Sequence, residues 1–232
     1  MKAVILAGGK GTRLRPYTKI FPKPLVPIDD KPVLEIIINQ LAKYGFNEII
    51  MAVGHLSELI QSFFSDGSKF GVKIEYSRED QPLGTAWPLL NIRDQLNETF
   101  LMMNGDVLTN LNISELISYH KNNNAVATIA LNSRKVDIDY GVVEIDDKST
   151  LTKWIEKPSI DYKVSMGIYI LEPEVLNYMP PNPPFDLPDL IQTLINNNKL
   201  VKGYSFNGFW LDLGRPEDYD KALNEISTIG EI

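Results

Sequence analysis

Hydrophobic and polar positions along the first half of the chain follow two periods, one typical of strands and one typical of helices. Apolar runs that predict buried strands lie at Lys2–Leu6, Glu48–Val53, Val72–Tyr76 and Phe100–Asn104. Helical spacing and end signals predict helices at Pro32–Tyr44, Ser57–Phe64, Thr85–Leu96 and Ile113–Lys121. Strands that alternate with helices predict a mainly parallel sheet covered by helices on both faces.

The second half of the chain has more strands and fewer helices. Strands are predicted at Ala125–Leu131, Gly141–Ile145, Leu151–Glu156, Ser165–Leu171 and Phe209–Asp212. Helices are predicted at Pro173–Tyr178, Asp186–Asn196 and Pro216–Ile226. No repeat or linker divides the chain. We therefore expect one α/β domain over residues 1–232, with a Rossmann-like mixed, mainly parallel sheet shared by two halves, about 1–122 and 123–232.

A long loop after the first strand is rich in glycine and in positive charge. It reads LAGGKGTRLRPYTKIFPKPLVP over residues 6–27. Glycines let backbone N–H groups approach an anion, and cations neutralise its charge. The loop therefore predicts a cradle for the polyphosphate of a nucleoside triphosphate. Its glycines are Gly8, Gly9 and Gly11, and its cations are Lys10, Arg13, Arg15, Lys19 and Lys23.

Two common phosphate-binding motifs are absent from this loop. A P-loop requires Lys and then Ser or Thr after its last glycine, but Thr12 and Arg13 follow Gly11. A dinucleotide fingerprint requires a third glycine where Leu14 stands. A glycine-rich turn with scattered surface cations is the alternative interpretation. Prolines 16, 22 and 24, which hold the cations in register, favour the phosphate cradle.

These motifs resemble the sugar-1-phosphate nucleotidyltransferases, also called nucleotide-sugar pyrophosphorylases. The resemblance begins with GG-x-GTR-L-x-P and PKPL-x-P, and it continues almost to the end of the chain. The later motifs are Pro82-Leu83-Gly84-Thr85-Ala86, Asn104-Gly105-Asp106, Glu156-Lys157-Pro158 and Trp210-Leu211-Asp212. The Lys-Pro-Leu form of the loop is most similar to the mannose-1-phosphate guanylyltransferase branch.

The resemblance implies roles for the loop residues in nucleotide binding and catalysis. Arg13 would hold the leaving pyrophosphate, and Lys23 would stabilise charge that develops at the α-phosphate. The implied nucleotide-binding residues are Leu6, Ala7, Gly8, Gly9, Gly11, Thr12, Arg13, Lys23, Gln81, Gly84 and Thr85.

Two aspartates are candidate ligands for Mg²⁺. Asp106 follows the predicted strand Phe100–Asn104, and ligands of open α/β sheets lie beyond the carboxyl ends of strands. Mg²⁺ binds through few protein oxygens and leaves other positions for phosphates and water. An ordinary Gly-Asp turn, and a turn cap at Asp212, are the structural alternatives. The resemblance implies that Asp106 and Asp212 are both metal ligands.

The resemblance places the sugar phosphate on residues from both halves of the chain. The implied residues are Asn104, Gly141, Glu156 and Lys157. Taken alone, an adjacent Glu and Lys after a strand are most often surface charges. In the family, this pair binds the hydroxyl groups and the phosphate of the sugar.

The expected reaction joins a nucleoside triphosphate to a sugar 1-phosphate and releases pyrophosphate. The resemblance favours GTP as the nucleotide and mannose or heptose 1-phosphate as the sugar. Trp87 and Pro88 stand where guanylyltransferases usually carry small residues, so the base is left open. One alternative is a uridylyl-, thymidylyl- or cytidylyltransferase of the same family. Another is a non-catalytic regulatory subunit that binds a nucleotide-sugar.

Composition limits the cellular compartments and the binding partners that we expect for this protein. The net charge of −7 argues against nucleic acid and anionic membranes as partners, although the loop concentrates positive charge locally. The chain has no cysteine and no apolar run long enough to cross a bilayer. We expect a cytoplasmic protein without the carboxyl-terminal β-helix of longer relatives. The oligomeric state is not predicted by these patterns.

Overall fold

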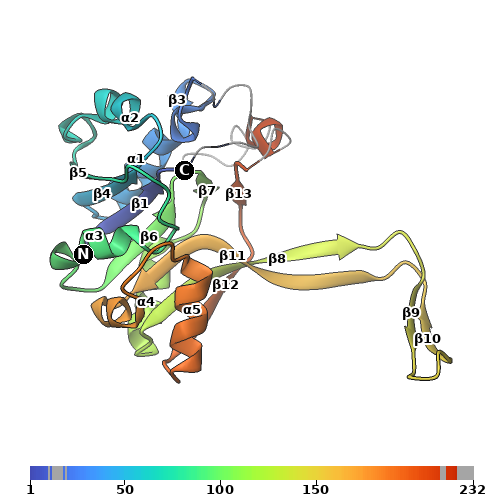
Figure 1. The fold of residues 1–232 in the computed structure, drawn as a ribbon. Helices are drawn as coiled ribbons and strands as arrows, with labels where there is room; N and C mark the ends of the chain where they lie inside the picture. Colours follow the sequence, from blue (N-terminus) through green and yellow to red (C-terminus); the bar gives the residue numbers. More distant parts are fainter. Residues whose placement is uncertain (10, 12–17, 19, 215–217, 224–232) are drawn as a thin grey trace.

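The computed structural model describes residues 1–9, 11, 18, 20–214 and 218–223, and a mixed seven-stranded sheet forms its centre (Figure 1). Four neighbouring strands are parallel, and β12 is parallel to β8, whereas β11 is antiparallel to both of its neighbours. This is the mixed, mainly parallel sheet expected. The strand order is β12 (Val201–Phe206), β8 (Ala127–Asp137), β11 (Ser159–Leu171), β6 (Phe100–Asn104), β1 (Ala3–Ala7), β4 (Glu48–Val53) and β5 (Lys73–Arg78).

Helices cover both faces of this sheet, as expected. Successive residues of a strand point to opposite faces, so Ile5 of β1 joins one hydrophobic cluster and Val4 joins the other. The first cluster contains α1 (Val33–Lys43), α2 (Ser57–Phe64) and α4 (Ile113–Asn122); the second contains α3 (Pro88–Asn91) and α5 (Leu187–Asn196). No helix in the described ranges is both long and apolar enough to cross a membrane.

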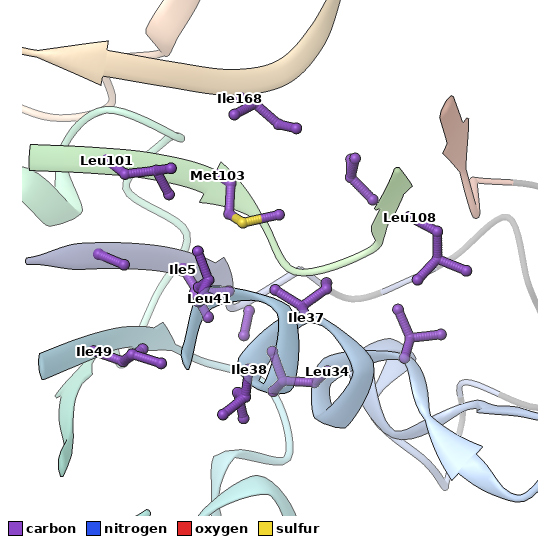
Figure 2. Packing of buried hydrophobic residues seen from close by; sticks show 14 of the residues in the cluster. Ile5, Leu34, Ile37, Ile38, Leu41, Ile49, Leu101, Met103, Leu108 and Ile168 are labelled. Carbon is purple, nitrogen blue, oxygen red and sulfur yellow. The ribbon is translucent and has the colours of Figure 1, made fainter. Parts of the chain in front are cut away.

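Helix α1 supplies much of the first cluster. Figure 2 shows its apolar side chains packed against residues of β1, β4 and β6. Their spacing of three or four residues places them on one side of the helix, which is why a helical period in the sequence produces a buried stripe. Among the labelled residues are Leu34, Ile37, Ile38 and Leu41 of α1, and Ile5, Ile49, Leu101 and Met103 of these three strands.

The prediction of a continuous helix over Thr85–Leu96 is wrong. Helix is limited to α3, and a 3₁₀ turn follows at Arg93–Gln95. The first backbone N–H groups of this segment bond elsewhere: those of Ala86 and Trp87 donate to the carbonyl of Phe185. These bonds tie the segment to the residues before α5, and the helix begins only at Pro88. The predicted helix Pro173–Tyr178 is also a 3₁₀ helix.

Several short strands were not predicted. They are β2 (Pro27–Ile28), β3 (Lys31–Pro32), β7 (Val107–Thr109) and the longer β12. Strands of two or three residues have too few positions to show a period of two. β7 pairs with the expected short strand β13 (Trp210–Asp212). Of the predicted last helix, residues 218–223 are helical and the remainder lies outside the described ranges.

A long ribbon leaves the body of the molecule. β8 and β11 extend together beyond the sheet, and β9 (Val142–Ile145) and β10 (Leu151–Ile155) form a hairpin at the far end (Figure 1). We call residues 132–164 the arm and the other described residues the body. Every residue of the arm is described, and none of them is buried.

Candidate functional site

A short, rigid turn positions Lys23. Residues Lys23–Leu25 form a 3₁₀ turn in which Leu25 N–H donates to the Pro22 carbonyl at 2.9 Å and Val26 N–H donates to the Lys23 carbonyl at 3.0 Å. Pro24 and Leu25 are buried, so the turn is anchored in the body. The Lys23 side chain is only 12% exposed. The two prolines of this turn therefore restrict where the ammonium group can lie.

Backbone pairing holds Asp106 and Asp212 at one edge of the body. Asp106 follows β6, and Asp212 ends β13, which pairs with β7 so that Asp212 lies opposite Val107. The Leu213 N–H also donates to the Asp106 carbonyl at 3.0 Å. These contacts place the two aspartates together although they are far apart in sequence.

The Lys23 ammonium lies against both carboxylates. Its Nζ donates a hydrogen bond to Asp106 Oδ2 and lies 3.8 Å from Asp212 Oδ1. Two acidic groups thus face one cation, and this is a donor set that suits Mg²⁺ when phosphate oxygens complete the shell. In the described part of the chain, no group of three or more acidic, histidine or cysteine residues could hold a metal by itself. The residues therefore fit a metal that arrives with a nucleotide, not a closed protein cage.

A pocket of about 400 Å³ adjoins this charged group. It lies beyond the carboxyl ends of β1 and β6, where open α/β sheets bind ligands. Asn104 forms part of the pocket wall. Its side chain packs against Gly167, where an added Cβ would lie 2.6 Å from Asn104 Nδ2. The predicted site residues that line the pocket are Leu6, Ala7, Gly8, Gly9, Lys23, Gly84, Thr85, Asn104 and Asp106.

Gly84 and Thr85 also have structural roles. Gly84 has φ +94°, and a side chain there would collide with the backbone of Phe185. The Thr85 hydroxyl donates to Asp186 Oδ1 at 2.9 Å and accepts from Leu187 N–H at 2.9 Å, so it fastens this motif to the start of α5. Their contribution to nucleotide binding stays a prediction.

Gln81 lies beside the first pocket instead of inside it. A second hollow, of about 570 Å³, is lined by Gln81, His55 and Asp80 and shares Gly8 and Gly9 with the first. The two hollows are therefore parts of one surface around the glycine loop. Trp87, whose bulk left the base open, is not among the residues that line either hollow.

Glu79 was missed by sequence reasoning. It follows β5 directly, its N–H donates to the Val53 carbonyl at 2.9 Å, and it lines both hollows. Its Oε1 is buried and has no hydrogen-bond partner among the described residues. Burial raises the pKa of Glu79 from 4.5 to about 7. The available signal was an acid immediately after a parallel strand, the position that had singled out Asp106.

The remaining loop residues are described only in part. Gly11 has φ +57°, and its carbonyl accepts a hydrogen bond of 2.6 Å from the Thr18 hydroxyl. The predicted residues Thr12 and Arg13 lie outside the described ranges. Their roles in triphosphate binding stay predictions.

The predicted sugar-binding residues of the second half lie on the arm. Gly141 and Glu156 are neighbours: a Cβ at Gly141 would lie 3.1 Å from Glu156 Oε2, and that oxygen accepts a hydrogen bond from Trp154 Nε1 at 3.1 Å. Lys157 follows with φ +43°. None of these residues lines the pocket that contains Lys23. The structure thus groups the predicted site in two places, one in the body and one on the arm (Figure 1).

Comparisons with known proteins agree with this fold. The model of the nucleotidyl transferase family matches residues 2–228, and the chain belongs to this family.

Relatives in this family differ in the base they use. A UTP–glucose-1-phosphate uridylyltransferase of Synechocystis sp. is 36% identical over 97% of this chain and 63% of its own length. Mannose-1-phosphate guanylyltransferase 1 of Arabidopsis thaliana is 36% identical over 96% of this chain and 64% of its own length. The chain therefore spans less than two thirds of the curated relatives it matches.

A solved structure has the same fold over nearly its whole length. The protein, from Bacillus anthracis, is described as a glucose-1-phosphate thymidylyltransferase and was crystallised with sucrose. It superposes with a TM-score of 0.81 at 25% identity, over 99% of this chain and 96% of its own. This match extends the choice of base among similar proteins to thymine.

Proposed function

We propose that this protein is an enzyme that condenses GTP with a mannose- or heptose-like sugar 1-phosphate to give a GDP-sugar and pyrophosphate. The observation that carries the proposal is the contact of Lys23 with Asp106 and Asp212 beside the glycine loop. A cation set between two carboxylates, next to exposed backbone at a sheet edge, suits the handling of phosphate charge.

The chemistry requires charge neutralisation more than proton transfer. A sugar phosphate loses its second proton with a pKa near 6, so at neutral pH its oxygen attacks without a general base. Lys23 would stabilise negative charge that grows at the α-phosphate, and Arg13 would hold the pyrophosphate that leaves. Asp106 and Asp212 would hold Mg²⁺, which supplies further positive charge to the phosphate oxygens when it is bound.

Glu79 supports the choice of guanine. In its ionised form, the Glu79 carboxyl only accepts hydrogen bonds, and guanine offers two adjacent donors, N1–H and the N2 amino group, that would favour this form. Uracil and thymine offer one N–H between two carbonyl oxygens, and a carboxylate oxygen would be repelled by these carbonyl oxygens. Glu79 lines the pocket with one buried carboxylate oxygen that has no partner in the described chain, and guanine would provide one.

Two alternative functions predict different results. A uridylyl-, thymidylyl- or cytidylyltransferase would use the same body site with another base. A regulatory subunit would bind a nucleotide-sugar without turnover, but such a protein has no need for Lys23 to meet both aspartates. The convergence of these three side chains therefore favours an enzyme.

The test is pyrophosphate release with GTP, UTP, dTTP and CTP, each with mannose 1-phosphate and then other sugar 1-phosphates. We expect kcat/KM for GTP to exceed that for UTP and dTTP at least about tenfold, equivalent to about 1.4 kcal/mol. Glu79→Gln should reduce this ratio, whereas Asp94→Asn, a change at an exposed acid that lines neither hollow, should leave it unchanged. Equal or reversed preference would assign the protein to another branch, and no release with any pair would favour the regulatory subunit.

A further inference from the structure

The hairpin of the arm has one strongly apolar face. Ile145 of β9 pairs with Leu151 of β10, and Val143 pairs with Trp154. Directly paired residues point to the same face of a ribbon, and residues 143 and 145 share that face because they are two apart. These four side chains are 43–61% exposed. Glu144 and Lys153 form an ion pair on the opposite face.

Such a ribbon is poorly stabilised by itself. A two-stranded hairpin is marginal in water unless a third strand or a helix covers its apolar face. In this structure nothing buries any residue of the arm, although every residue of the arm is described. The exposed apolar face formed by Val143, Ile145, Leu151 and Trp154 therefore indicates an interaction surface.

The arm also separates the two parts of the predicted site. Gly141, Glu156 and Lys157 lie at the base of the hairpin, and β8 and β11 pair continuously outward as far as Asp137 and Ser159. This pairing directs the arm away from β1, β6 and β13, whose ends form the body site (Figure 1). The body therefore presents a nucleotide site with one predicted sugar-phosphate residue, Asn104, and the arm presents the other three without a nucleotide site.

We propose that the arm of one copy of this chain inserts into the body site of a second copy. Each complete site of the symmetric dimer would combine Lys23, Asp106 and Asp212 of one copy with Glu156 and Lys157 of the other. A second copy is the occupant that carries the missing half of the site. The inference rests on the proposed function where it is tested by enzyme activity. A second test, by cross-linking, depends only on the geometry of the dimer.

The body offers an apolar surface beside the site that could receive the arm. Ile20 and Phe21 are 74% and 51% exposed, and only Pro22 separates them from Lys23 in the loop. Covering them with the apolar face of the hairpin would remove both exposed surfaces from water, which is favourable. A two-fold dimer repeats the contact once and then closes, so it leaves no arm unpaired.

Complementation between two variants tests where the arm acts, with the sugar phosphate held far below its KM for Lys157→Ala so that neither variant alone has measurable turnover. Lys23→Ala damages the body half of the site, and Lys157→Ala damages the arm half. After the two proteins are mixed and their subunits exchanged, half of the dimers are mixed and each contains one intact site. We expect the mixture to recover about one quarter of the wild-type rate. Recovery near zero after demonstrated exchange would mean that each arm serves its own body, and it would overturn the inference.

Cross-linking provides a test that does not depend on activity. The natural chain has no cysteine, so a Phe21→Cys, Ile145→Cys double variant has only the two introduced thiols. A short bismaleimide should join two chains into a covalent dimer, and Phe21→Cys alone should give far less dimer. An intrachain link, or a monomer by sedimentation, would overturn the inference. If the wild type releases no pyrophosphate yet these dimers form, the proposed function fails and the arm exchange stands.

Discussion

The body and the arm use similar side chains in opposite ways. Ile5, Leu101 and Met103 of the body are at most 1% exposed, and helices cover the sheet on both faces. Ile145 and Trp154 of the arm are both 61% exposed. Apolar residues at every second position of a strand thus form a packed core where helices cover the sheet. They form an exposed apolar face where nothing covers it. The body is stabilised by its own core, whereas the arm depends on what it contacts.

The largest expected effect contrasts truncation of a core side chain with truncation of an arm side chain. Met103→Ala should lower the free energy of unfolding by about 2–5 kcal/mol, because it removes buried contacts and leaves a cavity. Ile145→Ala should cost less than about 1 kcal/mol in dilute protein, because its side chain is largely exposed already. Urea unfolding of both variants measures the difference. Equal losses would show that the arm has a core of its own.

The next effect contrasts the catalytic contributions of the two regions. Lys23→Ala should lower kcat about 10²-fold, because its charge matches one that grows in the transition state. Lys157→Ala should mainly raise KM for the sugar phosphate, because it binds a charge that is already present in the ground state.

Steady-state kinetics with each substrate varied separates these two outcomes. Unchanged circular dichroism and unfolding midpoints serve as the control that neither variant has lost its fold. A rise in KM alone for Lys23→Ala would contradict its role in the transition state.

Much of the body could be predicted from the sequence because its signals are local. The bounds of β4, β6 and α2 are those predicted, since each has a clear period and distinct ends. Lys23 and Asp106 were singled out as candidates for the same reason, since one lies in a proline-bounded loop and the other comes two residues after a strand; their roles stay predictions. The position of Asp212 near them depends on the pairing of β7 with β13, which the sequence did not specify.

Other features depend on contacts that no local pattern encodes. The backbone of Thr85–Trp87 bonds to Phe185 and Asp186, a hundred residues away, and the helix begins only after this tertiary tie. The strand predicted at Gly141–Ile145 is present as β9, but the sequence pattern could not show whether anything covers that strand. Glu79 was overlooked because its burial arises from packing of the loops around it.

The smallest expected effect is on how stability depends on pH, where an acid of the body and an acid of the arm should act in opposite directions. Burial raises the pKa of Glu79 to about 7, so the folded protein holds a proton that the unfolded chain loses near pH 4.5. The stabilisation this gives is complete below pH 4.5 and is lost as the pH rises toward 7. We expect a loss of roughly 1 kcal/mol, less than the full shift implies because solvent reaches part of the side chain.

Asp146 on the arm provides the comparison of opposite sign. Hydrogen bonds from the backbone of Thr150 and Lys148 lower the pKa of Asp146, so its contribution is present at neutral pH and disappears in acid. Unfolding measured from pH 4 to 8 should therefore show Glu79→Gln gaining on the wild type as the pH rises, and Asp146→Asn gaining as it falls. A wild type and a Glu79→Gln variant with parallel profiles would show that the carboxyl of Glu79 is as well solvated as the acids of the arm.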